Sequence, residues 1–272
     1  MNNIITHSLI TVALLTTVSI ADTAVSTEEV GVSDVEAQYS AKSTIDASDE
    51  LKQSLNFGFS NTSGNTDTTN LNAKYTMSFT TVGYEEEKLK VGFDAGAFLN
   101  KSDDVTSNEE YTANLGLEQY IGNDGWLGYG AINWLRNPDF KNLDNKIAIG
   151  AGLGKVVYSD ATQTLQIKVG GAYNIQQYAD NTEDAKFASV NEYIEYNNLL
   201  NKTSALYVKI GSMQNVDDFE NDYEVLAVAG LAFSVAENIS VTIEEEVLYD
   251  KIHPGTKDDT DTKSIVRVGY NF

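Results

Sequence analysis

The 272-residue chain contains no cysteine, two prolines and two histidines. Without cysteine it can form neither a disulfide framework nor a thiolate metal site. Basic residues are also scarce, because 18 Lys and Arg stand against 40 Asp and Glu and the formal net charge is −22. Nucleic-acid binding needs clustered Lys and Arg, so this balance argues against DNA or RNA as a partner. It argues equally against simple adhesion to an anionic lipid surface.

Long hydrophobic runs are missing as well. The one N-terminal apolar run, about residues 9–20, is too short for a membrane-spanning helix, which needs ~20 apolar residues. Ser19 and Ala21 precede Asp22 in the small-residue pattern of a signal peptidase site. We therefore expect residues 1–21 to be a signal peptide, although no Lys or Arg precedes the apolar run.

The rest of the chain divides into a leader and one domain. Residues 22–50 are acidic and have no sustained period, which predicts a flexible leader. From residue 51 the hydrophobic period is two, as in strands whose side chains alternate between two faces. In KLKVGFDAGAFL, for example, apolar residues alternate with Lys90, Gly92 and Asp94. Turn residues divide residues 51–272 into about twelve predicted strands, near 51–61, 66–80, 86–100, 109–121, 125–136, 145–157, 162–176, 185–199, 202–214, 221–235, 238–252 and 262–272.

The connections between these strands form two alternating sets. One set is tight: TVGYE, IGNDG, YSDATQ, LLNKT and VAENIS. The other is longer and mostly acidic: NKSDDVTSNEE, RNPDFKNLDN, QQYADNTEDAK, QNVDDFEND and DKIHPGTKDDTDT. A soluble sandwich also alternates, but its strands are usually shorter, ~5–6 residues. The sequence therefore predicts an all-β fold, a transmembrane antiparallel β-barrel of about 12 strands with both termini at the periplasmic rim of a bacterial outer membrane.

Some positions carry specific expectations. Tyrosines near strand ends are candidates for the aromatic girdles of a barrel: Tyr75, Tyr129, Tyr173, Tyr223, Tyr249 and Tyr270. Tyr120, Tyr193 and Tyr207 are expected to point inward. Small residues such as those of GAGLG make room for bulky side chains across a lumen. Glu245 stands on the apolar face of its strand, which predicts a bulge or a strand end there.

Charged residues of both signs fall on the predicted lumenal face. They are Lys74, Lys90, Asp94, Glu118, Lys146, Lys168, Lys209, Glu224, Glu244, Glu246 and Arg267. In one interpretation they pair across the interior and plug it, because unpaired buried charges are costly. In the other they line a narrow wet pore and bias which ions or small solutes pass. With about twelve strands a narrow or closed lumen is favoured.

The last segment, SIVRVGYNF, places Val266, Val268, Tyr270 and Phe272 on one strand face. A closing strand must be well formed to its end, because it pairs with the first strand. This ending also resembles the C-terminal signal that the barrel assembly machinery reads. The expected partners are therefore that machinery during biogenesis, and outer-membrane lipid and lipopolysaccharide afterwards. The sequence indicates no oligomeric state.

Several segments together resemble the salt-induced outer-membrane protein family, also called domain of unknown function 481. They are LNFGFSNTSGNTDTTNLNAKY, YTANLGLEQYIGNDGWLGYG, NPDFKNLDNKIAIGAGLGK and VRVGYNF, within about residues 50–272. SGNT and GAGLG are the most specific parts. The resemblance implies an outer-membrane barrel and, through the family's name, a link to salt or envelope stress. It implies no catalytic residues.

No catalytic, cofactor or metal motif is present in the sequence. His7 lies in the expected signal peptide and His253 beside Pro254, so a histidine base next to a barrel-wall nucleophile is not indicated. GAGLG lacks the Lys-Ser or Lys-Thr of a phosphate loop, and the acidic loops lack EF-hand spacing. We therefore expect no enzyme activity, no cofactor and no metal. The alternatives are an outer-membrane enzyme acting on lipid and a barrel that binds a ligand through its long acidic loops.

Overall fold

The computed structural model describes residues 51–63, 68–102, 105–138, 142–180, 182–251 and 260–272, and in them the chain forms twelve strands. The expected signal peptide and leader lie outside these residues. Every predicted strand is confirmed, with ends that shift by a few residues. The strands are β1 Lys52–Ser63, β2 Thr68–Val82, β3 Lys88–Ser102, β4 Val105–Ile121, β5 Trp126–Asn137, β6 Leu143–Ser159, β7 Gln163–Tyr178, β8 Ala185–Asn201, β9 Ser204–Asn215, β10 Tyr223–Ala236, β11 Ile239–Asp250 and β12 Thr260–Asn271.

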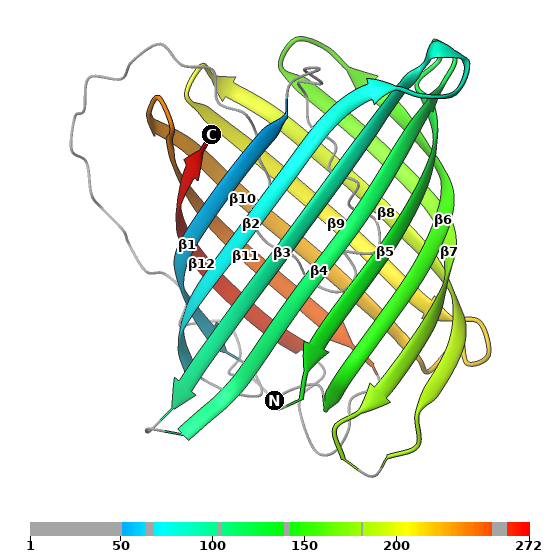
Figure 1. Ribbon diagram of the computed structural model, residues 1–272, viewed down its shortest axis with the longest axis vertical. Coiled ribbons are helices and arrows are strands. Elements are labelled where there is room, and N and C mark those ends of the chain that lie inside the picture. The colour runs from blue at the N-terminus through cyan, green and yellow to red at the C-terminus, as the bar shows by residue number, and fades with distance from the viewer. Residues whose placement is uncertain (1–50, 64–67, 103–104, 139–141, 181, 252–259) are drawn as a thin grey trace, which may run out of the picture.

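The sheet closes on itself, as predicted. Each strand pairs antiparallel with its chain neighbours, and β12 pairs with β1, where Leu55 lies opposite Tyr270 (Figure 1). The tilted strands wrap around one interior, and the red last strand lies beside the blue first one (Figure 1). Closure satisfies the hydrogen-bonding edges of both end strands, which would otherwise invite pairing with other chains.

The two faces of the barrel differ in composition. Inward side chains such as Asn174 on β7 and Glu118 on β4 are fully buried. Outward positions carry large apolar side chains that remain about half exposed, including Ile149, Val169 and Val268. A largely apolar exterior around an interior rich in polar side chains is the arrangement that a bilayer requires of a barrel. Among the described residues, no helix has the length and apolar character needed to cross a membrane.

The two rims differ, although less completely than predicted. The tight turns 83–87, 122–125, 160–162, 202–203 and 237–238 are confirmed at one rim. The prediction of a long loop at NKSDDVTSNEE is wrong, because β3 and β4 continue to pair within this segment as far as Ser102 and Val105. A register shift between Asn100 and Lys101 accommodates the extra residue. Polar residues there extend the ladder instead of leaving it.

The turn between β6 and β7 is held by one carboxylate. Asp160 accepts hydrogen bonds from the Tyr158 hydroxyl at 2.5 Å and from the backbone N–H groups of Thr162 and Gln163 at 2.7 and 2.8 Å. These bonds, the tyrosine's first and the backbone ones next, lower the pKa of Asp160 to about 2 because they favour its charged form. The ionised carboxylate therefore stabilises this turn.

Two positional predictions are wrong. Tyr129 is not a girdle residue: it is buried inside the barrel, because it pairs in register with the inward-facing Glu118. Nor does Glu245 mark a bulge or a strand end. The β11 ladder is unbroken around it, and Glu245 faces outward, where it accepts a hydrogen bond of 2.6 Å from the Ser264 hydroxyl on β12. That bond lets a carboxylate remain among outward-facing apolar neighbours.

The remaining tyrosine predictions agree with the structure. Tyr173 and Tyr270 are about half exposed on the outer face, and Tyr75, Tyr223 and Tyr249 occupy outward positions. Tyr193 and Tyr207 are buried inside, and Tyr120 packs against the buried cluster there.

Candidate functional site

The lumen is the candidate site, because the predicted charged residues converge there. Ten of the eleven are buried: Lys74, Lys90, Glu118, Lys146, Lys168, Lys209, Glu224, Glu244, Glu246 and Arg267. Asp94 is half-buried and accepts a hydrogen bond of 2.8 Å from the Asn114 amide. Buried charges must be paired or solvated, so their partners decide what the lumen can do.

The Glu118–Lys168 ion pair is fully buried inside the barrel. Lys168 Nζ on β7 is 2.5 Å from Glu118 Oε1 on β4, and both side chains have no exposed surface. The ammonium also lies 5.4 Å from the Tyr193 ring centre and 5.9 Å from that of Tyr129. Aromatic faces attract a cation, most strongly where water is excluded. The pair joins two strands that are not neighbours in the sheet, so it spans part of the lumen.

A second buried group is centred on Glu244 of β11. Its carboxylate accepts a hydrogen bond of 2.5 Å from the Tyr207 hydroxyl on β9 and one of 3.1 Å from Arg267 Nη1 on β12. Lys209 Nζ lies 5.1 Å from the centre of the Tyr207 ring. Charge-assisted bonds of this kind are stronger than neutral ones. Glu244 therefore connects three strands across the inner wall.

Further pairs lie nearer the long-loop rim. Lys146 on β6 and Glu224 on β10 are 3.4 Å apart, although these strands are not neighbours. Lys263 on β12 lies 3.4 Å from Glu246 on β11 and 3.8 Å from Glu110 on β4. The pairs between non-neighbouring strands thus occur at several heights and join strands that are three or four places apart in the sheet.

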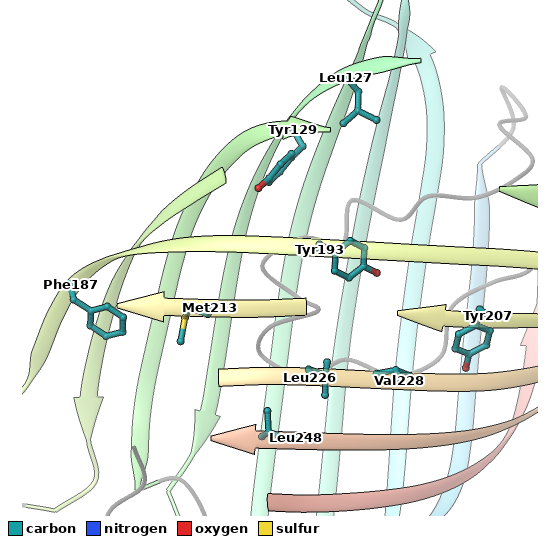
Figure 2. Close-up of a cluster of buried hydrophobic side chains, with 9 residues drawn as sticks. All are labelled: Leu127, Tyr129, Phe187, Tyr193, Tyr207, Met213, Leu226, Val228 and Leu248. Carbon is teal, nitrogen blue, oxygen red and sulfur yellow. The ribbon is translucent and has the colours of Figure 1, made fainter. Parts of the chain in front are cut away.

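Apolar and aromatic side chains fill the space between these pairs. Figure 2 shows nine of them, from β5, β8, β9, β10 and β11, projecting into the interior. Glycines supply the room that was expected of GAGLG. A Cβ on Gly152 would lie 2.6 Å from the Tyr129 ring, and one on Gly170 would lie 2.3 Å from the Tyr129 hydroxyl. The Tyr129 ring therefore fits only because the facing residues, Gly152 and Gly170, have no side chain.

Sequence reasoning missed further charged residues of the lumen, among them Glu195, Glu110 and Lys263. Glu195 is buried and accepts a hydrogen bond of 2.7 Å from the Asn197 amide. Glu110 and Lys263 pair at the long-loop end. The signal was available, since Glu195 alternates in phase with Tyr193, and Lys263 alternates in phase with Arg267.

The C-terminal residues lie on the outer face. Val266, Val268, Tyr270 and Phe272 are each about half exposed, and the rings of the last two stack with centres 6.0 Å apart. The backbone N–H of Phe272 donates a 3.0 Å hydrogen bond to the carbonyl of Gln53, so the last residue is still attached to β1. Their role as an assembly signal stays a prediction.

The described part of the chain holds no group of three or more His, Cys, Asp or Glu side chains placed to bind a metal ion. His253, on which the lipid-enzyme alternative depends, lies outside the described residues, as does His7.

Comparisons with known proteins agree on the fold. No curated protein sequence matches the chain. Among solved structures, the NanC porin superposes with a TM-score of 0.53 at 10% identity, covering 79% of this chain and 98% of the porin. An outer-membrane channel from Pseudomonas putida F1 gives 0.50 at 8% identity, covering 82% and 95%. At such identities the likeness shows the fold alone, an outer-membrane type of β-barrel.

The family assignment rests on sequence. One family model, described as "Protein of unknown function, DUF481", matches residues 55–272. This match includes all of β2 to β12 and most of β1. The resemblance carried by SGNT, GAGLG and the final strand is thereby confirmed, and this chain belongs to the DUF481 family.

Proposed function

We propose that this protein is a non-catalytic barrel of the bacterial outer membrane that acts as a narrow, low-conductance pore for ions and small solutes. The observation that carries the proposal is the cross-lumen pairing of buried charges, with Glu118–Lys168 at its centre. Polar side chains on the inner wall can line a path for ions, and the ion pairs and the apolar side chains between them narrow that path. The fold supports the proposal, because the NanC porin and the Pseudomonas putida channel use barrels of this kind.

The charges also predict weak ion selectivity. The inward-facing Lys and Arg named above are balanced by a similar number of Asp and Glu, and most of the pairs lie within hydrogen-bonding distance. A ring of charges of one sign would select either cations or anions. Paired charges of opposite sign leave no net field that favours either kind of ion. The pore should therefore discriminate little between potassium and chloride.

Planar bilayers under a potassium chloride gradient test this proposal. We expect the refolded full chain to give small, steady openings with a reversal potential near zero. A silent membrane despite confirmed insertion would contradict the pore and leave a structural barrel. Large porin-like openings would contradict the closing role of the charge pairs.

The absence of catalysis is part of the proposal and has its own test. The substitution His253→Ala should leave the lipid profile of the host membrane unchanged when variant and wild type are expressed at equal levels. A change in that profile would revive a lipid-modifying enzyme. The link to salt or envelope stress rests on the family resemblance, and transcript levels under salt shock test it.

A further inference from the structure

A cavity lined by both apolar and polar residues opens inside the lumen near the long-loop rim. It has a volume of about 40 Å³ and lies between β2, β3, β4, β11 and β12. One ordered water needs roughly 10–15 Å³ measured in this way, so the cavity has room for a molecule of several heavy atoms. The polar side chains that line it and carry the argument are Asn72, Lys74, Glu110, Glu246, Lys263 and Arg267.

The charges of this cavity are arranged along the barrel axis. Arg267 lies four residues further into the barrel on β12 than Lys263 does, and Lys74 also lies well inside β2. The deep end therefore presents a guanidinium and an ammonium as donors, and the charge of Arg267 is balanced by Glu244, which lies 3.1 Å from its Nη1. Nearer the rim, two carboxylates, Glu110 and Glu246, share one ammonium, that of Lys263. The cavity thus has cationic donors at its floor and two carboxylates near its rim.

Two buried polar atoms in this cavity lack hydrogen bonds within the described residues. Asn72 Nδ2, a donor, has no acceptor, while its Oδ1 is held by Arg267 Nε at 3.1 Å. Glu246 Oε1, an acceptor, has no hydrogen-bond donor, although the Lys263 ammonium lies 3.4 Å away. Leaving buried donors and acceptors unpaired is costly, and here the two atoms have opposite hydrogen-bonding sense.

We propose that this cavity binds a small zwitterion that carries an ammonium and a carboxylate, the chemistry of a small α-amino acid. The carboxylate lies towards Arg267, Lys74 and Asn72 Nδ2, and the ammonium lies towards Glu246 and Glu110. A simple anion would leave Glu246 without a donor, and a simple cation would leave Asn72 without an acceptor. A zwitterion satisfies both and adds no net charge to a lumen whose charges are already paired.

The rim end is accessible, as such a site requires. The side chains of Lys263 and Glu110 keep 19% and 12% of their surface exposed, whereas those of Arg267 and Glu246 keep 7% and 3%. A ligand that enters from the rim therefore passes Lys263 and Glu110 before it reaches Arg267 and Glu246. If the bound molecule is also the solute that the pore admits, the inference rests on the proposed function. Binding to the cavity does not require the barrel to conduct.

Ligand-observed saturation-transfer NMR of the detergent-solubilised full chain tests the site, because it detects millimolar dissociation constants. The probes are glycine, acetate, methylammonium and ethylene glycol. We expect saturable glycine binding, with at least tenfold weaker binding of each of the other three. No glycine binding would overturn the proposal. Equal binding of acetate would reduce the site to an anion site and also overturn it, as would equal binding of ethylene glycol.

Matched variants locate the binding. Asn72→Asp and Glu246→Gln should each weaken glycine binding at least tenfold. Asn133→Asp and Glu192→Gln make the same chemical changes outside the cavity lining, the first at a buried lumenal position and the second on the outer face, and should leave binding within twofold. Loss of binding in the control variants alone would overturn the assignment. Heat-modifiable migration on gels shows that each variant is folded.

The same titration separates the two proposals. A chain that binds glycine but passes no current contradicts the pore and keeps the site. A chain that conducts but does not bind glycine keeps the pore and overturns the site.

Discussion

Removing one member of the Glu118–Lys168 pair should damage the barrel far more than removing both. At 2.5 Å and an effective dielectric constant of 20, the attraction between the two charges is roughly 7 kcal/mol. Both side chains have no exposed surface, so desolvation costs several kcal/mol for each ion and offsets most of that attraction. The net value of the intact pair is therefore small.

The single substitution Lys168→Met leaves the Glu118 carboxylate buried without its partner, which should lower the free energy of unfolding by ~3–5 kcal/mol. The double variant Glu118→Gln with Lys168→Met removes both charges and should lie within about 2 kcal/mol of the wild type. Urea titrations of the folded barrel in lipid vesicles, followed by tryptophan fluorescence, measure these differences. Lys186→Met removes an exposed cation and should change stability by less than about 0.5 kcal/mol.

Two results would refute this reasoning. If Lys168→Met were as mild as Lys186→Met, the buried pair would not exist in the folded barrel. If the double variant were as unstable as the single one, the loss would come from packing around Tyr129 and Tyr193 and not from an uncompensated charge.

Three further predictions concern packing, the outer face and pH. Gly230→Ala puts a Cβ 2.1 Å from the Tyr207 ring and should lower the free energy of unfolding by ~1–3 kcal/mol. At Gly128 the nearest atom would be 4.0 Å from the new Cβ, so Gly128→Ala should be nearly neutral. The urea midpoints of the two variants test this difference. Glu245→Leu removes a carboxylate from the apolar exterior and should raise the urea midpoint in vesicles, so a lower midpoint would show that its serine hydrogen bond outweighs the charge. Asp160 has a folded pKa of about 2, below its ordinary 3.8, so the stability that its charged form contributes is present above pH 4 and is lost as the pH falls through 2. Asp160→Asn should therefore flatten the dependence of unfolding free energy on pH in this range. An unchanged pH dependence would contradict the role of Asp160 in the turn.

The fold was predictable because alternation and turn chemistry are local properties. A strand such as KLKVGFDAGAFL shows its period without reference to any other strand, and Lys90 on its predicted lumenal face is buried inside the barrel. The prediction failed where both faces are apolar. In WLGYGAINWL, Leu127 and Tyr129 point inward while Ile132 points outward, so hydrophobicity could not identify the inner face. Only the register with β4 decides it.

The candidate site was predictable as a set of residues but not as a set of contacts. The alternation of residues along each strand is enough to place Glu118 and Lys168 on the polar face. That these two meet depends on barrel closure and strand stagger, which bring β4 towards β7 across the lumen. The same holds for the cavity, whose lining comes from strands at opposite ends of the sequence. Pairing partners therefore had to come from the structure.

Single-channel conductance of the wild type, compared with the Glu118→Gln, Lys168→Met double variant, tests the central claim most directly. Glu192→Gln is the control, because this carboxylate faces outward and accepts a hydrogen bond from Ser212. If the pair narrows the pore, the double variant should conduct severalfold more than the wild type, and the control should not differ from it. Equal conductance in all three proteins would contradict the claim that paired charges close the lumen.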